Sequence, residues 1–453
     1  MKRFIATLGM TSLLLPVGST KAQTAVTDYQ GNWKVFQYNT PSRWVEGYYN
    51  NLTQQVRNSF DQKGFAGENE ILVDIYYPES QTTGAADIAV ASNGNISGGF
   101  SGTSAISNGR LVTNVDDEFQ TFFPAPNLGF LVGVIHDSDT QYMNVLVKKQ
   151  GIPAGSELAG NWSVVGYSTP AKLQETFYSN NSQSNRIGAD DQDFAQQGEQ
   201  LVDLNYSEAP EVFSATLTFS SGGSVSGDES GSFVINGTSG EISLAISGDN
   251  TYPLMATPNR ELLMGVFQDE LVQDFNVLVK QGSNPTLSEV AGSWRVCVFT
   301  APTQIMKNGA LLDAYLSGDY NARHLAMRIS TDGSASVGGE AATVSVSGPS
   351  VNLNVDGQTY SLKPTISRDI MAGVFTDGNE QELIILVREP RLDVELSSTN
   401  LNITWGGMAN ALLQSSDNLS SWDDEGTLTP NGTVSKSTSG GTVKFYRVVA
   451  PAQ

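Results

Sequence analysis

The chain has 453 residues, too many for one hydrophobic core, and this length suggests three or four domains. Apolar residues make up 39% and charged residues only 16% of it, with 45 glycines. This composition is typical of many short strands joined by turns. The formal charge of −22 repels nucleic acids and anionic lipids, so neither is expected as a partner.

The N-terminus has the features of a secretory signal. Lys2 and Arg3 supply the positive start, residues 4–17 are apolar, and the small residue Ala22 precedes a predicted cleavage site. Beyond residue 22, no apolar run approaches the ~18 residues that a spanning helix needs. We therefore expect a signal peptide over 1–22 and a secreted or extracytoplasmic protein without a transmembrane segment.

One module occurs three times, marked by four motifs in a constant order. The first is Gly-x-Trp followed by a proline, with its tryptophans at Trp33, Trp162 and Trp294. The second is an apolar pair followed by aspartate, at Asp74, Asp203 and Asp313. The third is Gly-Val-Ile/Phe with a later aspartate, at Asp137, Asp269 and Asp377. The fourth is an apolar run ending in a basic residue, at Lys148, Lys280 and Arg388. The motifs predict modules at 23–152, 153–284 and 285–390, the third being shorter.

Each module is expected to be all-β. Its apolar runs are short and are separated by turn residues every 8–12 positions, which favours an up-and-down antiparallel meander. About eight strands is the number at which such a sheet closes into a barrel. In the first module we predict strands near 32–38, 71–77, 86–92, 95–101, 109–115, 119–124, 129–136 and 141–148.

Barrel closure would place the tryptophan of the first strand beside the basic residue of the last. A cation over an indole ring contributes about 0.5–1 kcal/mol when exposed. This layout, with Gly-x-Trp first and a basic residue last, resembles the lipocalin-like barrels. The resemblance covers the two ends of each module and implies a closed barrel that holds a small apolar ligand.

Residues 391–453 have a different pattern and are expected to form a small separate β domain. Leu401, Ile403 and Trp405 alternate as in a strand, Trp422 follows, and the segment 445–448 (Phe-Tyr-Arg-Val) ends the domain. This segment resembles the small β domain at the C-termini of secreted planctomycete and verrucomicrobial proteins. The resemblance implies an exported bacterial protein with a sorting or adhesion tail.

The repeat alignment separates scaffold residues from candidate site residues. Cys297, the only cysteine, aligns with Phe36 and Val165, which indicates a core position and excludes an intramolecular disulfide. His136 aligns with a glutamine and a threonine, so the module does not require it. With two histidines and no zinc or Gly-x-Ser-x-Gly motif, we predict neither a catalytic site nor a metal site.

The two repeated aspartates have different predicted roles. Asp137, Asp269 and Asp377 precede polar turns and are expected to bond the backbone two residues on. Asp74, Asp203 and Asp313 fall within apolar strands, where they would face solvent. Two alternatives remain for this second trio: a calcium ligand, the one cofactor left open, or half of a carboxylate pair that cleaves a glycosidic bond.

The first two modules carry extra residues at 42–71 and 171–200, and loops on a rigid scaffold often carry function. In the first insertion, apolar residues spaced four apart, from Trp44 to Phe60, predict a short amphipathic helix that plugs the barrel. The alternative is an aromatic platform for a sugar or an apolar ligand. The candidate contact residues are Trp44, Tyr48, Tyr49, Phe177 and Tyr178.

We expect a secreted or cell-surface protein that contacts a glycan or protein and has no evident catalysis. One alternative is a carrier with a small apolar ligand in a barrel. A lumen lined by small residues would support the carrier, and one filled by Trp, Phe and Leu would argue against it. A second alternative is an enzyme on polysaccharide, which needs two carboxylates about 5–10 Å apart at a groove. The sequence does not predict the oligomeric state.

Overall fold

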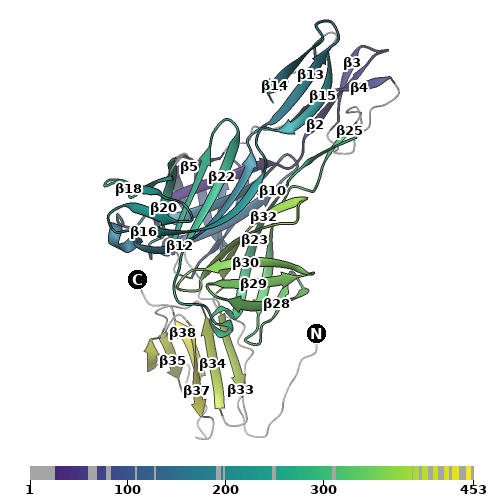
Figure 1. Cartoon of the computed structure of the whole chain (residues 1–453). Coiled ribbons are helices and arrows are strands. Elements are labelled where there is room, and N and C mark those ends of the chain that lie inside the picture. Colours follow the sequence, from purple (N-terminus) through teal and green to yellow (C-terminus); the bar gives the residue numbers. More distant parts are fainter. Residues whose placement is uncertain are drawn as a thin grey trace. The chain divides into compact units, whose positions relative to one another are not determined.

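A computed structural model describes residues 26–59, 69–77, 83–107, 110–126, 129–189, 195–196, 199–246, 251–308 and 313–389, and six strands between 391 and 449. The predicted signal peptide lies outside these residues. Val26–Glu389 forms one compact unit, and the residues from Pro390 onward belong to another. Apart from three short helical turns, the described elements are strands (Figure 1). The predicted all-β class is confirmed.

The first unit contains three closed eight-stranded barrels. The first barrel consists of β1 (Gly31–Pro41), β5 (Gly84–Val90), β6 (Asn95–Gly98), β7 (Gly102–Ser107), β8 (Arg110–Val115), β9 (Glu118–Pro124), β10 (Phe130–His136) and β11 (Thr140–Lys148). The second consists of β12 (Gly160–Pro170), β16 (Glu211–Phe219), β17 (Ser224–Gly227), β18 (Gly231–Ile235), β19 (Ile242–Ile246), β20 (Thr251–Ala256), β21 (Leu262–Gln268) and β22 (Val272–Lys280). The third consists of β23 (Gly292–Pro302), β26 (Asn321–Ile329), β27 (Ser334–Val337), β28 (Glu340–Ser347), β29 (Ser350–Val355), β30 (Gln358–Pro364), β31 (Ile370–Thr376) and β32 (Glu380–Arg388).

One predicted strand of the first module is not part of its barrel. Residues 71–77 were expected to be a barrel strand, but β4 (Glu70–Tyr76) pairs with β2 (Val45–Asn50) in a separate sheet. The eighth barrel strand is β7, whose small and polar residues give a weak strand pattern. Gly102 begins β7 where a Cβ atom would lie 2.2 Å from the Asn114 carbonyl oxygen, so this strand pair needs glycine for its close approach.

The predicted contact between the tryptophan and the cation is present in all three barrels. Each tryptophan lies opposite the basic residue on the neighbouring last strand. The cation lies over the indole at 5.6 Å for Lys148, 5.7 Å for Lys280 and 4.5 Å for Arg388. The barrels therefore close as expected, between first and last strands.

A helical turn caps one end of each barrel. These turns are η1 (Val26–Tyr29), α1 (Gly155–Leu158) and α2 (Leu287–Val290). The indole Nε1 of each tryptophan donates to the last carbonyl of its turn, at 2.9, 2.8 and 2.9 Å respectively. The basic residue donates to a carbonyl of the same turn, as Lys280 does to Glu157 at 2.6 Å. The sequence analysis predicted no helical turn at these positions.

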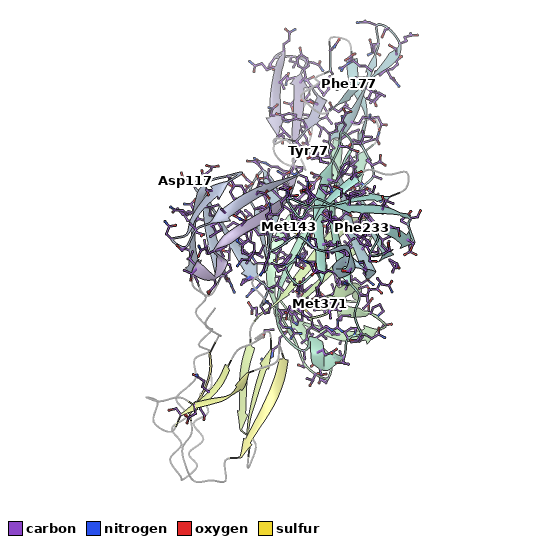
Figure 2. The ribbon with its side chains drawn as sticks, turned by 90° about the vertical axis from the view of Figure 1, so that its left-hand side faces the viewer. Tyr77, Asp117, Met143, Phe177, Phe233 and Met371 are labelled. Atoms are coloured by element: carbon purple, nitrogen blue, oxygen red, sulfur yellow. The ribbon has the colours of Figure 1, made fainter. Side chains whose placement is uncertain are left out.

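Large side chains fill the barrel interiors. Figure 2 labels Phe233 in the second barrel and Met371 in the third. The interior clusters include Trp33, Phe122 and Leu131 in the first barrel, Trp162, Phe219 and Phe233 in the second, and Trp294, Met327 and Met371 in the third. This filling argues against a ligand carried inside the described part of any barrel.

A shared core joins the three barrels. In β1, Trp33 and Val35 point into the barrel, whereas Phe36 and Tyr38 point out and are equally buried. The Tyr38 ring meets Tyr167 of the second barrel at 5.8 Å and Phe299 of the third at 5.5 Å, both edge-on. Met143, labelled in Figure 2, belongs to the same cluster. The three repeats are therefore one packed body.

Cys297 lies in this shared core and is completely buried, as its alignment with Phe36 and Val165 predicted. Burial raises the pKa of its thiol to about 12. A thiol that stays protonated at neutral pH is a poor nucleophile, which agrees with a packing role.

A ring of glutamines fixes the barrels around the shared core. Gln141 of the first barrel donates to the Thr300 carbonyl of the third at 2.7 Å. Gln381 of the third donates to the second, and Gln273 of the second donates to the first, at 2.6 and 2.7 Å. The three donors occupy the same position in their last strands. Buried amides paired in this way fix one relative orientation of the barrels.

The second repeated aspartate of each module fixes the hairpin before the last strand, as predicted. In the second barrel, Asp269 accepts hydrogen bonds from the backbone nitrogens of Leu271 and Val272, at 2.8 and 2.9 Å. Asp137 and Asp377 accept the same pair of bonds in their own modules. Backbone hydrogen bonds lower the pKa of Asp377.

We expect Asp269→Ala to lower the free energy of unfolding by about 1 kcal/mol, because two backbone donors lose their acceptor. Asp269→Asn keeps an acceptor oxygen and should have a smaller effect. Chemical denaturation of both variants measures the difference. Equal losses in the two variants would contradict the proposed bonding role.

The second unit contains two three-stranded sheets. One joins β33 (Arg391–Leu396), β34 (Asn400–Gly406) and β37 (Asn431–Ser437). The other joins β35 (Leu412–Ser416), β36 (Asp423–Thr427) and β38 (Phe445–Val449). The alternating residues Leu401, Ile403 and Trp405 lie in β34, and the segment 445–448 lies in β38.

Candidate binding surface

The residues before the second barrel strand of each module fold outside the barrels into small sheets, which we call the crown. The first sheet joins β2, β3 (Gln55–Ser59) and β4. The second joins β13 (Leu173–Ser179), β14 (Ser184–Ala189) and β15 (Glu199–Tyr206), and the third joins β24 (Ile305–Asn308) and β25 (Asp313–Leu316). Figure 1 shows the first two sheets projecting beyond the barrels.

The helix predicted for the first insertion is wrong, because this segment forms β2, a turn at 51–54, and β3. A four-residue spacing marks one face of a helix, but it also marks one face of a strand, where side chains alternate every two residues. Tyr48 in β2 and Trp44, which directly precedes β2, both lie in the core. Phe60 lies outside the described residues.

One face of the crown is buried and continues into the shared core. Tyr48 and its equivalent Phe177, labelled in Figure 2, are completely buried. Arg57 lies over the Tyr48 ring at 4.7 Å, and Arg186 lies over Phe177 at 4.5 Å. Each arginine also pairs with a glutamate on the strand beyond the central strand of its sheet, at 2.7 and 2.8 Å. The two sheets are therefore built on the same plan.

The two sheets also contact each other directly. The buried carboxylate of Glu175 on β13 accepts a hydrogen bond at 2.8 Å from the backbone nitrogen of Ile75 on β4. The backbone nitrogen of Ala195 donates to the Val73 carbonyl at 3.2 Å. These hydrogen bonds connect the crown sheet of the first module to that of the second, so the two modules build this part of the crown together.

The first repeated aspartate differs among the modules. Asp74 was expected to face solvent, but it is completely buried in β4. Its equivalent Asp203 is half-buried and bonds the Leu204 backbone and the Asn205 amide, at 3.1 and 2.9 Å. The side chain of Asp313 lies outside the described residues. Among those described, no group of three or more His, Cys, Asp or Glu residues is placed to hold a metal ion.

Tyrosines from all three modules meet where the crown joins the barrels. The hydroxyls of Tyr77 and Tyr320 lie 3.0 Å apart, and both side chains are buried. Burial raises the pKa of Tyr320 to about 12, and burial with Tyr320 raises that of Tyr206. Neutral phenols at this joint tie the crown to the barrel body (Figure 2, Tyr77).

The opposite face of the first crown sheet carries exposed apolar side chains. Tyr49 lies directly across from Val56 on β3 and Ile71 on β4, so the three share one face. Val56 is 50% exposed, and Leu52 at the adjoining turn is 76% exposed. In the second sheet, Ile187 is 65% exposed. Exposed apolar residues of this size often mark contact surfaces.

The predicted contact residues divide into two groups. Trp44, Tyr48 and Phe177 are buried, whereas Tyr49 and Tyr178 are half-buried. The prediction missed the exposed neighbours Ile71, Ile187 and Val202. Reading β4, β14 and β15 as strands with alternating faces would have identified them.

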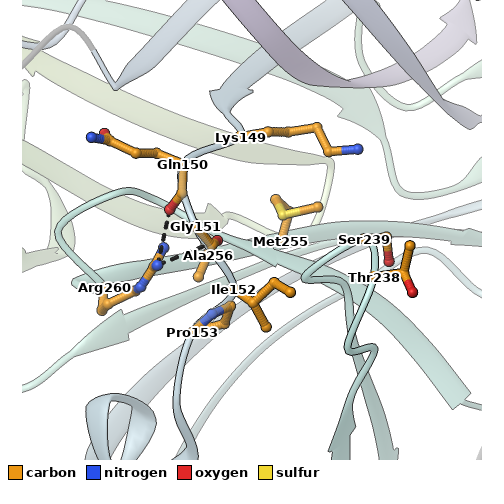
Figure 3. Close-up of a pocket in the computed structure, with 10 residues that line it drawn as sticks. All are labelled: Lys149, Gln150, Gly151, Ile152, Pro153, Thr238, Ser239, Met255, Ala256 and Arg260. Atoms are coloured by element: carbon orange, nitrogen blue, oxygen red, sulfur yellow. Dashed lines mark hydrogen bonds between the residues drawn. The ribbon is translucent and has the colours of Figure 1, made fainter.

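A pocket of about 200 Å³ lies where the first barrel connects to the second (Figure 3). Arg260 at its edge donates to the carbonyls of Gln150 and Gly151, at 3.0 and 3.4 Å. Lys149 pairs with Asp87 at 2.9 Å. Because both cations already have partners, we interpret the pocket as part of the contact between the second barrel and the segment that connects it to the first.

No helix among the described residues is long and apolar enough to span a membrane.

Comparison with known proteins identifies no family for this chain. No family model matches it, and no curated protein has significant sequence similarity to it. Among solved structures, transferrin binding protein B of serogroup B Neisseria meningitidis matches at 8% identity with a TM-score of 0.20, over 78% of this chain and 75% of that one. A transferrin binding protein B double mutant from Haemophilus parasuis matches at 6% identity with a TM-score of 0.20, over 80% and 76%. At these scores the matches support no inference about arrangement or ligand.

Proposed function

We propose that the protein is an extracytoplasmic binding protein in which the three barrels are a rigid support and the crown is the contact surface. The observation that carries this proposal is the exposed apolar face formed by Tyr49, Val56 and Ile71. Residues inserted into a repeated scaffold create this face, and such insertions commonly carry function.

The barrel interiors support this assignment by elimination of a carrier role. Trp, Phe, Leu and Met side chains fill the described interiors of the barrels. A ligand would therefore bind on an outer surface. The alternative of a polysaccharide-cleaving enzyme has weaker support, because Glu46, Asp74 and Glu175 are buried in the crown. A carboxylate pair must reach its substrate to cleave it.

The chemistry of the exposed face fits a glycan ring or an apolar protein segment. An aromatic ring flanked by aliphatic side chains offers a flat apolar surface of the kind that packs against either ligand. We propose an adhesive or matrix-contact role on this basis. From its resemblance to exported bacterial tails, we propose that the C-terminal unit serves sorting or surface retention.

The crown can be tested with matched surface substitutions. The combined variant Leu52→Ser, Val56→Ser and Ile187→Ser removes crown side chains that are 76%, 50% and 65% exposed. The control variant Phe119→Ser and Val234→Ser removes barrel side chains that are 70% and 67% exposed. Labelled mature proteins are applied to a glycan array and to intact bacterial cells.

We expect the crown variant to bind at least about tenfold more weakly than the unmodified protein, and the barrel control to bind within about twofold. Both variants should unfold at the same temperature as the unmodified protein, since the changed residues are exposed. Equal binding by all three proteins, or no binding by the unmodified protein, would contradict the proposal.

A further inference from the structure

Both histidines of the chain lie at the junction between the first and third barrels. His324 on β26 packs against Phe123 on β9, with ring centroids 4.9 Å apart and the ring planes tilted by 51°. His136 ends β10, and its Nδ1 accepts a hydrogen bond from the backbone nitrogen of Ala322 at 3.3 Å. An imidazole nitrogen accepts a hydrogen bond only while it is unprotonated.

Two arginines surround the Phe123 ring with His324. The guanidinium carbons of Arg110 and Arg295 lie 4.9 and 5.0 Å from the ring centroid. The same carboxylate oxygen of Glu389 lies 2.8 Å from Arg295 and 3.7 Å from Arg110. One negative charge therefore faces two positive charges at this junction before His324 is protonated.

Among the described residues, the remaining groups around the histidines supply no counter-charge for His324. The residue paired with it on β23 is Cys297, whose thiol is neutral. Its chain neighbour Arg323 adds a further cation, which lies 3.4 Å from Glu382. Asp137 follows His136, but its carboxylate accepts the backbone bonds of the adjoining turn.

We propose that the junction between the first and third barrels is an acid-sensitive latch operated by these two histidines. Protonation of His324 places a third cation beside Arg110 and Arg295. Protonation of His136 removes the acceptor for the Ala322 backbone nitrogen. Both events weaken contacts between the two barrels without breaking either barrel.

The direction of the pH dependence follows from His324. Burial, followed by Arg295 and Arg110, lowers its pKa below the ordinary value of 6.5. The unfolded chain therefore binds this proton more readily than the folded chain. The stabilising contribution of neutral His324 is present above about pH 6.5 and is lost as the pH falls below that value.

The junction between the second and first barrels provides an internal control. There Gln268, which aligns with His136, accepts a hydrogen bond from the Thr83 backbone nitrogen at 2.7 Å. Glutamine does not titrate, so this contact should not respond to acid. The substitution His136→Gln copies this arrangement, and His324→Gln removes the imidazole of His324.

Hydrogen exchange of the full mature chain at pH 7.5 and 5.0, corrected for the intrinsic rate, tests the latch. We expect protection of the Ala322 amide, which is bonded to His136, to fall at least about threefold at pH 5.0, while the Thr83 amide, which is bonded to Gln268, changes less. The double variant His136→Gln and His324→Gln should lose this selective effect. An equal acid response in the double variant would overturn the proposal.

A nuclear magnetic resonance titration gives a second readout in which His324 is not substituted. The chain has two imidazole signals, and the signal missing in His136→Gln belongs to His136. We expect the remaining signal, from His324, to titrate below pH 6.5. Titration at or above 6.5 would overturn the proposal, even if the double variant failed to fold.

Discussion

Replacing Tyr38 by alanine is expected to lower the free energy of unfolding by about 4 kcal/mol, because it opens a cavity where the three barrels meet. Tyr38 is completely buried and packs against Tyr167, Phe275 and Phe299. Its hydroxyl lies 2.6 Å from the Thr169 hydroxyl of the second barrel. The loss should affect all three barrels, since the cavity borders each of them.

Tyr38→Phe is the matched control, because the third module already has Phe299 at this position. It keeps the ring and removes the hydroxyl, so we expect a loss of about 1–2 kcal/mol. Guanidinium denaturation monitored by tryptophan fluorescence measures both variants. A loss below 1 kcal/mol for Tyr38→Ala would contradict the shared core.

Replacing Arg388 by methionine is expected to destabilise the third barrel by about 3 kcal/mol. The side chain is almost fully buried, and its guanidinium donates to the carbonyls of Arg368 and Ala291, at 2.9 and 2.8 Å, and to that of Glu289. It also lies over Trp294 at 4.5 Å. Methionine fills a similar volume but leaves these carbonyls without their charged donor.

Lys148→Met, at the equivalent position of the first barrel, should cost about 1 kcal/mol. Lys148 lies farther from its indole, at 5.6 Å, and makes one long bond to a carbonyl, at 3.4 Å. Thermal unfolding of both variants compares the two sites. Equal losses would show that the extra hydrogen bonds of Arg388 do not contribute.

The repeat, the barrel closure and the pairing of tryptophan with cation could be predicted from sequence because each leaves a fixed motif at a fixed spacing. The burial of Cys297 followed from its alignment with two apolar residues. The hairpin aspartates could be predicted because a short side chain bonds backbone groups only two and three residues away. These interactions are local or repeated, so spacing alone identifies them.

The shared core could not be predicted by treating the modules as independent. Its signal was present: in β1, β12 and β23 both alternating faces are apolar, so each strand must be buried on two sides. The same pattern occurs in the last strands, for example in residues 145–147. What covers the second face is another repeat, and strand periodicity does not identify a partner.

The helix predicted in the first insertion was wrong for a different reason. Residues four apart satisfy both a helix face and a strand face, and only the turn at 51–54 decides between them. Asp74 is buried in β4, and no local pattern in the sequence indicates this burial. The exposed residues Val56 and Ile187 could then be recognised only after the strands had been assigned.

Native-state hydrogen exchange across a guanidinium series tests most directly whether the three barrels are one cooperative body. The shared core and the glutamine ring predict that the slowest amides of β1, β12 and β23 merge into one unfolding transition, with one free energy and one denaturant dependence. Three separate transitions, one for each barrel, would contradict a shared core and would show that the barrels unfold as independent domains.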